Sequence, residues 1–301
     1  MTTDELRSRL GRVGIWMPPP ERLGLDPAAT AAAIERAGFT SVWVGGGNPD
    51  QASFDRLRAQ LAGTERLIVA TGIANVWAWE PAELRAAAEA LGADFPGRFI
   101  LGLGVSHAPL VEALGQAYQR PLGKMEKFLD ELDHPAFHGG ERQLPPIVIA
   151  ALGPKALELA REQALGSHPY FTTPEHTRFA REALGAAPLL IPELACTLDR
   201  DPAAGAATAR AYAARYLQMP NYTRNLERFG FGAADLEGTG SGRLISEIIP
   251  NGSAALLERL NSHLDAGADH VVIQPLDAGG FTPAALATLA TAVAELCICV
   301  P

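Results

Sequence analysis

The chain has 301 residues, of which 48% are hydrophobic and 20% are charged. This composition supplies material for a large hydrophobic core and excludes a disordered or fibrous protein. The formal net charge of −9 argues against nucleic acid as a partner, because binding to phosphates needs clustered Lys and Arg side chains.

Short apolar runs alternate with longer amphipathic stretches along the chain, a pattern typical of βα units. The predicted strands are 12–17, 41–44, 67–73, 98–103, 146–150, 167–171, one within 188–198, and 270–275. The predicted helices are 26–37, 50–61, 80–93, 154–164, 175–184, 202–217, 254–266 and 283–296. Residues 220–253 break this rhythm with short helical pieces and many Gly and Asn residues, so we interpret them as an insertion.

Strands and helices at this spacing predict a (β/α)8 barrel of the TIM type. A doubly wound open sheet would also alternate, but the first strand-to-helix turn lacks the GxGxxG motif of dinucleotide-binding folds. There is no internal repeat and no low-complexity linker. We therefore predict one domain, 1–301, with an irregular insertion at about 220–253.

The N-terminal segment 1–10 is charged and lacks the apolar stretch of a signal peptide. No apolar run reaches the roughly 18 residues that a membrane-spanning helix needs. We therefore expect a cytoplasmic protein without a membrane partner.

In such a barrel, function resides at the C-terminal ends of the strands. After the third strand, Gly72 permits a bulge or a close backbone approach, and Asn75 follows at the barrel mouth. At the end of the fourth strand, two glycines let the backbone come close to a ligand, and the loop that follows presents Ser106 and His107. A lone histidine is often structural, but this position favours a functional role. The aromatic residues nearby either pack over the rim or form a wall for a flat ligand.

Two further strand ends carry polar groups. After the fifth strand, Gly153 precedes Pro154 at a helix start, where free backbone N–H groups and Lys155 favour a phosphate. Proline at the first helical position is also ordinary capping chemistry. The loop after the sixth strand contains His168 and His176, the second of which also fits a helix-capping segment.

Several catalytic motifs are missing from the sequence. There is no HExxH, no Cys/His cluster with metal-ligand spacing, no GxSxG elbow and no P-loop. No pair of carboxylates occupies two strand ends, which argues against a glycosidase. We expect no metal site. Aromatic walls, glycines and a helix start suited to phosphate favour a bound redox cofactor that supplies the chemistry.

The strings around these positions resemble the luciferase-like monooxygenase superfamily, and within it the oxidoreductases that depend on the deazaflavin coenzyme F420. The matching segments, in order, are 70–77, 96–109, 150–155, 168–177, 220–222 and 265–271. The resemblance covers nearly the whole chain. It implies a TIM-type barrel with an insertion before its last units, a homodimer, and hydride transfer between C5 of the cofactor and a small organic substrate.

The resemblance also implies where the cofactor binds. A non-prolyl cis peptide, here Gly72–Ile73, would back its central ring, and the turn at residues 152–154 would approach its phosphate-bearing tail. The implied cofactor-binding residues are Gly72, Ile73, Asn75, Gly104, Val105, Ser106, His107, Leu152, Gly153 and Pro154. The candidate proton donors or acceptors are His107, His168 and His176, with His107 first because imidazole titrates near neutral pH.

The end of the second strand departs from the pattern of several deazaflavin-dependent relatives, which carry a charged Asp-His or similar pair there. This chain has Val44 followed by three glycines. The resemblance therefore gives no basis for transferring a specific sugar-phosphate or alcohol dehydrogenase activity from those relatives. FMN is an alternative cofactor, in a monooxygenase that uses reduced flavin and oxygen. A non-catalytic cofactor-binding protein is a third interpretation, and the substrate is not identified by the sequence.

Overall fold

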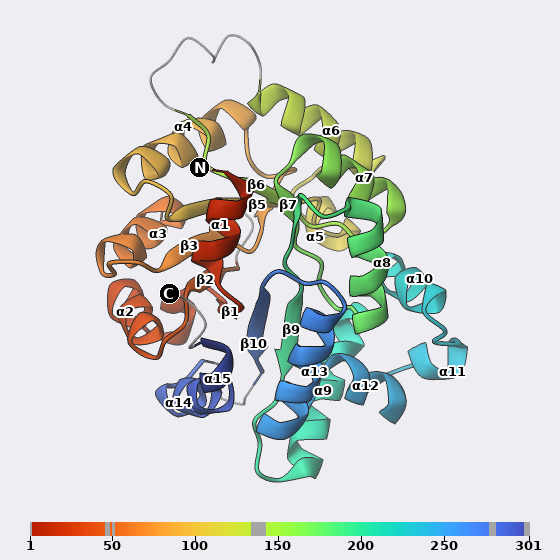
Figure 1. The fold of residues 1–301 in the computed structure, drawn as a ribbon. Coiled ribbons are helices and arrows are strands. Elements are labelled where there is room, and N and C mark those ends of the chain that lie inside the picture. The colour runs from red at the N-terminus through yellow and green to blue at the C-terminus, as the bar shows by residue number, and fades with distance from the viewer. Residues whose placement is uncertain (1, 46–48, 50–51, 134–142, 277–280, 298–301) are drawn as a thin grey trace.

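The computed structural model describes residues 2–45, 49, 52–133, 143–276 and 281–297. A parallel β-sheet lies in the centre, and helices surround it (Figure 1). The strands are β1 (Val13–Met17), β2 (Ser41–Val44), β3 (Ile68–Thr71), β4 (Ala74–Asn75), β5 (Phe99–Gly104), β6 (Ile147–Ile149), β7 (Gly166–Ser167), β8 (Leu189–Leu190), β9 (Glu193–Cys196) and β10 (Val271–Pro275).

The sheet closes into a barrel. Its strand order is β8-β7-β6-β5-β3-β2-β1-β10-β9, with β4 paired to β5. β8 and β9 are consecutive parts of one run that bridges the two ends: the Ile191 N–H donates to the Ser167 carbonyl (2.8 Å), and the Val272 N–H donates to the Pro192 carbonyl (2.9 Å). The run is interrupted at Pro192, which has no N–H to donate. β3 and β4 likewise form one broken strand, so the predicted (β/α)8 barrel is confirmed.

The helices of the regular units are α2 (Pro27–Arg36), α3 (Ser53–Ala62), α4 (Pro81–Asp94), α7 (Pro154–Gln163), α8 (Pro174–Leu184), α9 (Pro202–Tyr216), α13 (Ser253–Asp265), α14 (Pro283–Ala292) and α15 (Ala294–Cys297). The predicted insertion contains α10 (Pro220–Arg228), α11 (Ala233–Leu236) and α12 (Gly242–Ile248). Most of these helices begin with proline, whose missing N–H is one that a helix start leaves unpaired anyway.

Three helices were not predicted from the sequence: α1 (Thr3–Leu10), α5 (Ala108–Glu112) and α6 (Pro121–Leu132). α1 begins with a capping box, in which the Thr2 side chain accepts the Glu5 N–H and the Glu5 carboxylate accepts the Thr2 N–H. α6 buries Met125, Phe128, Leu129 and Leu132 along one face. The charged residues of α1 and the Pro-Leu-Gly start of α6 explain why the sequence pattern did not predict these two helices.

Alternation along the strands divides the apolar residues between two sides of the sheet. One cluster fills the barrel interior and includes Trp43, Ile100 and Val148. Leu6 and Leu10 of α1 belong to the same cluster, so α1 packs against the barrel interior. A larger cluster lies between the strands and the outer helices. A third cluster joins α9, α10 and α12 with Phe171 and with Ala195 of β9, and therefore packs the insertion against the barrel.

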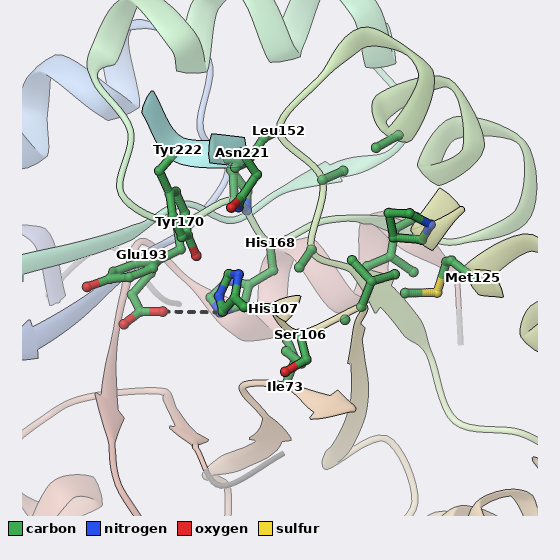
Figure 2. A pocket seen from close by; sticks show the side chains of 18 of the residues that line it. Ile73, Ser106, His107, Met125, Leu152, His168, Tyr170, Glu193, Asn221 and Tyr222 are labelled. Carbon is green, nitrogen blue, oxygen red and sulfur yellow. Dashed lines mark ion pairs between the residues drawn. The ribbon is translucent and has the colours of Figure 1, made fainter. Parts of the chain in front are cut away.

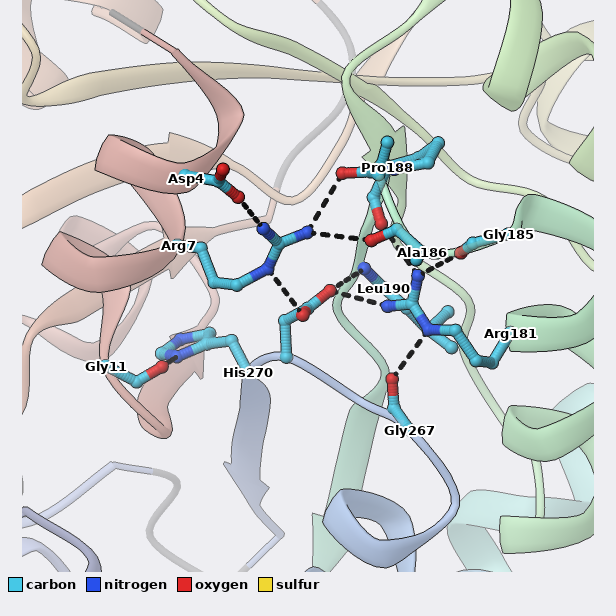
Figure 3. A network of polar contacts seen from close by, with 12 residues as sticks. Asp4, Arg7, Gly11, Arg181, Gly185, Ala186, Pro188, Leu190, Gly267 and His270 are labelled. Atoms are coloured by element: carbon cyan, nitrogen blue, oxygen red, sulfur yellow. Dashed lines mark hydrogen bonds and ion pairs between the residues drawn. The ribbon is translucent and has the colours of Figure 1, made fainter.

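Asp269, just before β10, joins segments that are distant in the sequence (Figure 3). Its carboxylate accepts from Arg7 Nε of α1 (2.8 Å), from an Arg181 guanidinium nitrogen of α8 (2.6 Å), and from the Leu190 N–H (2.8 Å). Both arginines also donate to main-chain carbonyls in the 185–188 turn. One carboxylate therefore ties α1 and α8 to β8 and β10.

We predict that Asp269→Ala lowers the free energy of unfolding by about 2–4 kcal/mol, because two partly buried guanidinium groups and one N–H lose their shared acceptor. Urea unfolding followed by circular dichroism measures this loss. The control is Asp4→Ala, which removes the other ion pair of Arg7; the Asp4 side chain is 91% exposed, so its loss should cost at most about 0.5 kcal/mol. Equal effects of the two substitutions would contradict this account.

Candidate functional site

A cavity of about 370 Å³ opens at the C-terminal ends of the strands. Its wall comes from residues that follow β3, β5, β6 and β7, from β9, and from α9 and α10 (Figure 2). Apolar and aromatic side chains predominate in it. Its size and lining are typical of a pocket for a small molecule or cofactor.

The third barrel strand forms one wall of the cavity through an irregularity. Ala70 pairs with Ile100, but Ala74 pairs with Leu103, so this strand carries one more residue than β5 between the two pairs. The Thr71 hydroxyl replaces main-chain hydrogen bonds that the extra residue interrupts between the two strands. It donates to the Gly102 carbonyl (2.7 Å) and accepts the Gly102 N–H (2.8 Å). This is a bulge.

Gly72 and Ile73 lie within this bulge and line the cavity. The peptide bond between them is cis, as the family resemblance implies. Trp16 Nε1 donates to the Gly72 carbonyl at 2.9 Å. The Ile73 side chain lies over Gly104, where an added Cβ would come within 2.4 Å of Ile73 Cδ1.

The glycines of β5 differ from the role that we inferred from the sequence. We had interpreted both as sites of close backbone approach to a ligand. A Cβ at Gly102 would lie 2.1 Å from the Thr71 carbonyl oxygen, so this glycine serves packing within the protein. Gly104 has both roles. Its missing side chain leaves room for Ile73, and the residue also lines the cavity.

The loop after β5 brings Val105, Ser106 and His107 to the cavity. Ser106 has a φ of 55°, in the left-handed region that only glycine adopts without cost. Its carbonyl accepts from Tyr118 Oη at 3.2 Å. The His107 ring contacts the Tyr222 ring, with 5.4 Å between centroids. Burial lowers the pKa of His107, so its imidazole is neutral at pH 7.

The turn after β6 lines the opposite part of the cavity with Leu152 and Gly153. Gly153 is the N-cap of α7, and an added Cβ there would meet no atom within 4 Å. The first N–H groups of a helix carry partial positive charge, so this end of the cavity favours an anion. Pro154 begins α7 but does not line the cavity.

His168 lies at the base of the cavity with its tautomer defined by its partners. Nδ1 donates to the Ile191 carbonyl at 2.7 Å, and the ring stacks on Trp43 with 4.4 Å between centroids. Nε2 therefore carries the lone pair; it has no hydrogen-bond partner and lies 3.8 Å from Glu193 Oε2. Burial lowers the pKa of His168 to about 4.

Two of the predicted site residues are buried outside the cavity lining. His176 Nε2 forms a hydrogen bond of 3.0 Å with the Leu152 carbonyl, so this histidine supports the turn that lines the cavity. Asn75 Oδ1 accepts the Trp77 N–H at 3.1 Å and thereby shapes the turn after β4. Apart from Pro154, the remaining predicted residues come together around one space. Two of the glycines after Val44, Gly46 and Gly47, lie outside the described residues.

Sequence analysis missed one carboxylate and several tyrosines in the cavity wall. Glu193 interrupts an apolar strand, and this interruption was the available signal. Tyr212 and Tyr216 lie four residues apart and so share one face of α9. Tyr212 Oη donates to Gln274 Oε1 (2.7 Å) and forms a hydrogen bond with Tyr216 Oη (3.1 Å). Tyr170 Oη donates to the Tyr212 hydroxyl.

Within the described part of the chain, no group of three or more His, Cys, Asp or Glu side chains is placed to hold a metal ion. A search of the same residues finds no helix with the length and apolar character needed to cross a membrane.

A family profile described as luciferase-like monooxygenase matches residues 25–275. The chain belongs to the luciferase-like monooxygenase family. The matched segment extends from just before α2 to the end of β10, and it therefore includes every strand except β1. The cavity of this luciferase-like protein lies at the face where barrel enzymes carry their active sites.

Similar proteins include a 5,10-methylenetetrahydromethanopterin reductase of Methanolobus tindarius, 28% identical over 167 residues, which are 48% of this chain and 51% of the relative. The chain spans about half the length of the curated relatives it matches. The coenzyme F420 dependent tetrahydromethanopterin reductase of Methanopyrus kandleri has a similar fold, with a TM-score of 0.69 and 14% identity over 95% of this chain and 99% of that one.

A second solved structure of this fold is the oxygenating constituent of 3,6-diketocamphane monooxygenase of Pseudomonas putida, in complex with FMN. Its TM-score is 0.70, with 13% identity over 97% of this chain and 99% of that one. At this identity the likeness concerns the luciferase-like fold alone.

Two more histidines are fully buried in the barrel wall. His270 Nε2 forms a hydrogen bond of 2.8 Å with Ser41 Oγ, and His263 Nδ1 forms one of 2.8 Å with Thr177 Oγ1. Burial lowers the pKa of His270 to about 4 and that of His263 to about 3. Burial likewise lowers the pKa of His176 to about 4.

We predict that acid below about pH 6.5 destabilises the protein through these four buried histidines. Their folded pKa values lie below the unfolded one, so the stability is complete above pH ~6.5 and is lost as the pH falls towards about 4. Each histidine contributes about 1.4 kcal/mol per pH unit in that window, roughly 5 kcal/mol per unit together. Urea unfolding at a series of pH values measures the slope. A free energy of unfolding that is constant between about pH 6 and pH 5 would contradict the prediction.

Proposed function

We propose that this protein is a coenzyme F420-dependent oxidoreductase, which transfers a hydride between C5 of the deazaflavin and a small organic substrate. The observation that carries the proposal is the make-up of the cavity. One wall is built from Ile73 and two residues without side chains, Gly72 and Gly104, and the α7 N-terminus borders the same space. Curated and structural relatives named as methanopterin reductases, one of them F420-dependent, support the choice of cofactor.

The residues present fit this cofactor. Gly72, Ile73 and Gly104–Ser106 would hold the tricyclic ring, since they line the cavity mainly with backbone. Leu152 and Gly153 would hold the start of the anionic tail, because Gly153 leaves open space beside the positive end of α7. When bound, F420 supplies a two-electron hydride carrier whose reacting atom is carbon. The sequence-based assignment of Asn75 and Pro154 to direct cofactor contact finds no support in the cavity lining.

The protein's own side chains would complete the site. Apolar groups such as Met125 and Leu122 restrict water in the cavity, which strengthens every polar interaction inside it. His107, neutral at pH 7, offers a ring nitrogen that accepts a proton or a hydrogen bond. The homodimer stays a prediction from the family resemblance, and the cytoplasmic location stays a prediction from the sequence.

FMN is the competing cofactor, because its ring system has a similar tricyclic shape. A solved structure of the same fold contains FMN, which keeps a flavin-dependent monooxygenase as the second candidate function. The two functions differ in the ligand that the purified protein retains and in whether oxygen is consumed.

We predict that the purified protein binds F420 at least about tenfold more tightly than FMN, a difference of about 1.4 kcal/mol. Side-by-side titrations that follow ligand fluorescence measure both dissociation constants. Tighter binding of FMN would replace the proposed function by the monooxygenase, and binding of neither ligand would refute both.

A second prediction concerns the anionic tail. Gly153→Glu places a carboxylate in open space at the α7 N-terminus and should weaken F420 binding by roughly tenfold or more through repulsion of the phosphate. Gly153→Gln has the same shape without the charge and is the matched control. Equal dissociation constants for the two variants would show that the tail binds elsewhere.

A further inference from the structure

Glu193 is distinctive among the described residues that line the cavity. It is the one carboxylate in this lining, and the lining includes no Lys or Arg. Its main chain is held rigidly at the start of β9: the N–H donates to the Pro169 carbonyl (2.9 Å), and β10 pairs with it at Val272. The residue is 7% exposed. Its side chain reaches the cavity next to His168 and Tyr170 (Figure 2).

No positive charge faces this carboxyl group from the elements packed around the cavity. The groups that face it are the neutral imidazole of His168 and four tyrosine hydroxyls, at Tyr170, Tyr212, Tyr216 and Tyr222. An isolated carboxylate in such surroundings is costly, so the neutral acid is favoured. Burial accordingly raises the pKa of Glu193 well above its usual range. The favoured neutral form is a carboxylic acid, which carries a proton that can be transferred.

We infer that Glu193 is the proton-transferring group of this site, and that the substrate is an uncharged carbonyl compound, or the corresponding alcohol in the reverse direction. This inference rests on the proposed function. It assigns the substrate to the side of the cavity formed by Glu193 and the tyrosines, where Figure 2 shows Glu193 beside Tyr170. The uncharged substrate follows from the lining, in which the described residues include no Lys or Arg to pair with an anionic substrate.

The alternative proton donors in the lining are weaker. His168 has committed its Nδ1 proton to the Ile191 carbonyl, and its Nε2 bears a lone pair that can accept a hydrogen bond from the acid. His107 is neutral at pH 7 because burial lowers its pKa. Burial raises the pKa of Tyr212, which makes its hydroxyl a poorer acid. Among these groups, Glu193 combines a position in the cavity lining with surroundings that favour its neutral acid form.

The step balances as follows for reduction. A hydride forms a new C–H bond at the carbonyl carbon, the π electrons of C=O move to oxygen, and that oxygen takes the proton of Glu193 to form O–H. The carbonyl compound gains two electrons, and the reduced deazaflavin loses two. Glu193 is left as a carboxylate and is reprotonated from solvent, which receives the proton that the deazaflavin loses on oxidation. In the reverse direction, the Glu193 carboxylate accepts the alcohol proton.

The test compares the wild-type protein with Glu193→Gln, a substitution that keeps the shape of the side chain but removes the proton that Glu193 would transfer. The first readout needs no cofactor. The infrared spectrum of the wild-type protein alone should show the C=O stretch of a protonated carboxyl group at neutral pH. This band should be missing in Glu193→Gln and present in Glu175→Gln, a matched control at an exposed position on α8. Absence of such a band from the wild-type protein would overturn the inference.

The second readout uses reduced F420 with cyclohexanone and acetophenone as uncharged probes and pyruvate as a charged one. We expect turnover of a ketone in preference to pyruvate, and a loss in kcat of roughly 10²- to 10⁴-fold in Glu193→Gln. The F420 dissociation constant should be unchanged, and the fall of wild-type activity at high pH should disappear from the residual activity. Glu175→Gln should match the wild type.

The outcomes separate the two proposals. Failure of F420 to bind refutes the proposed function, whatever the infrared spectra show. Binding of F420 with full ketone turnover in Glu193→Gln overturns the role of Glu193 alone. Binding of F420 with no turnover of either ketone, or with preference for pyruvate, overturns the assigned substrate class.

Discussion

The two hydrogen bonds between the Thr71 hydroxyl and the main chain of Gly102 hold the geometry on which the cavity depends. They allow the third barrel strand to carry an extra residue without leaving the sheet, and pairing resumes at Ala74 and Leu103. The bulge turns Gly72 and Ile73 towards the cavity, and the missing side chains of Gly102 and Gly104 provide the space. A glycine pair in β5 thus supports an irregularity in its neighbour.

The fold could be predicted because its strands are short apolar runs bounded by turn residues. β2 was located at Ser41–Val44 from four buried residues, and β10 was located to within one residue. The predictions were poorer where periodicity was broken by Pro or Gly near the start of an element, as in α6. The weak signal of β7 has a physical cause, since only Gly166 and Ser167 form its ladder.

The sequence predicted part of the candidate site. The residues that it misplaced or missed are those whose position depends on the three-dimensional fold. Glycines and polar residues directly after a strand were brought together, because all parallel strands end at one face. His176 was misplaced because a residue three positions into a helix points according to helix phase, which here directs it to the Leu152 carbonyl. Glu193 escaped notice because a single carboxylate in an apolar strand gives no spacing pattern; only the fold shows that it faces a cavity without cations.

The insertion contributes Asn221 and Tyr222 to the cavity but packs its own apolar residues in a cluster separate from the barrel core. This placement of the insertion has an evolutionary consequence. Residues of α10 that contact a ligand can diverge while the ladder of β-strands and the Asp269 bridge continue to carry the folding free energy. The same barrel could thus acquire new substrates through drift in one peripheral segment, and a laboratory library confined to that segment would explore specificity at little risk to folding.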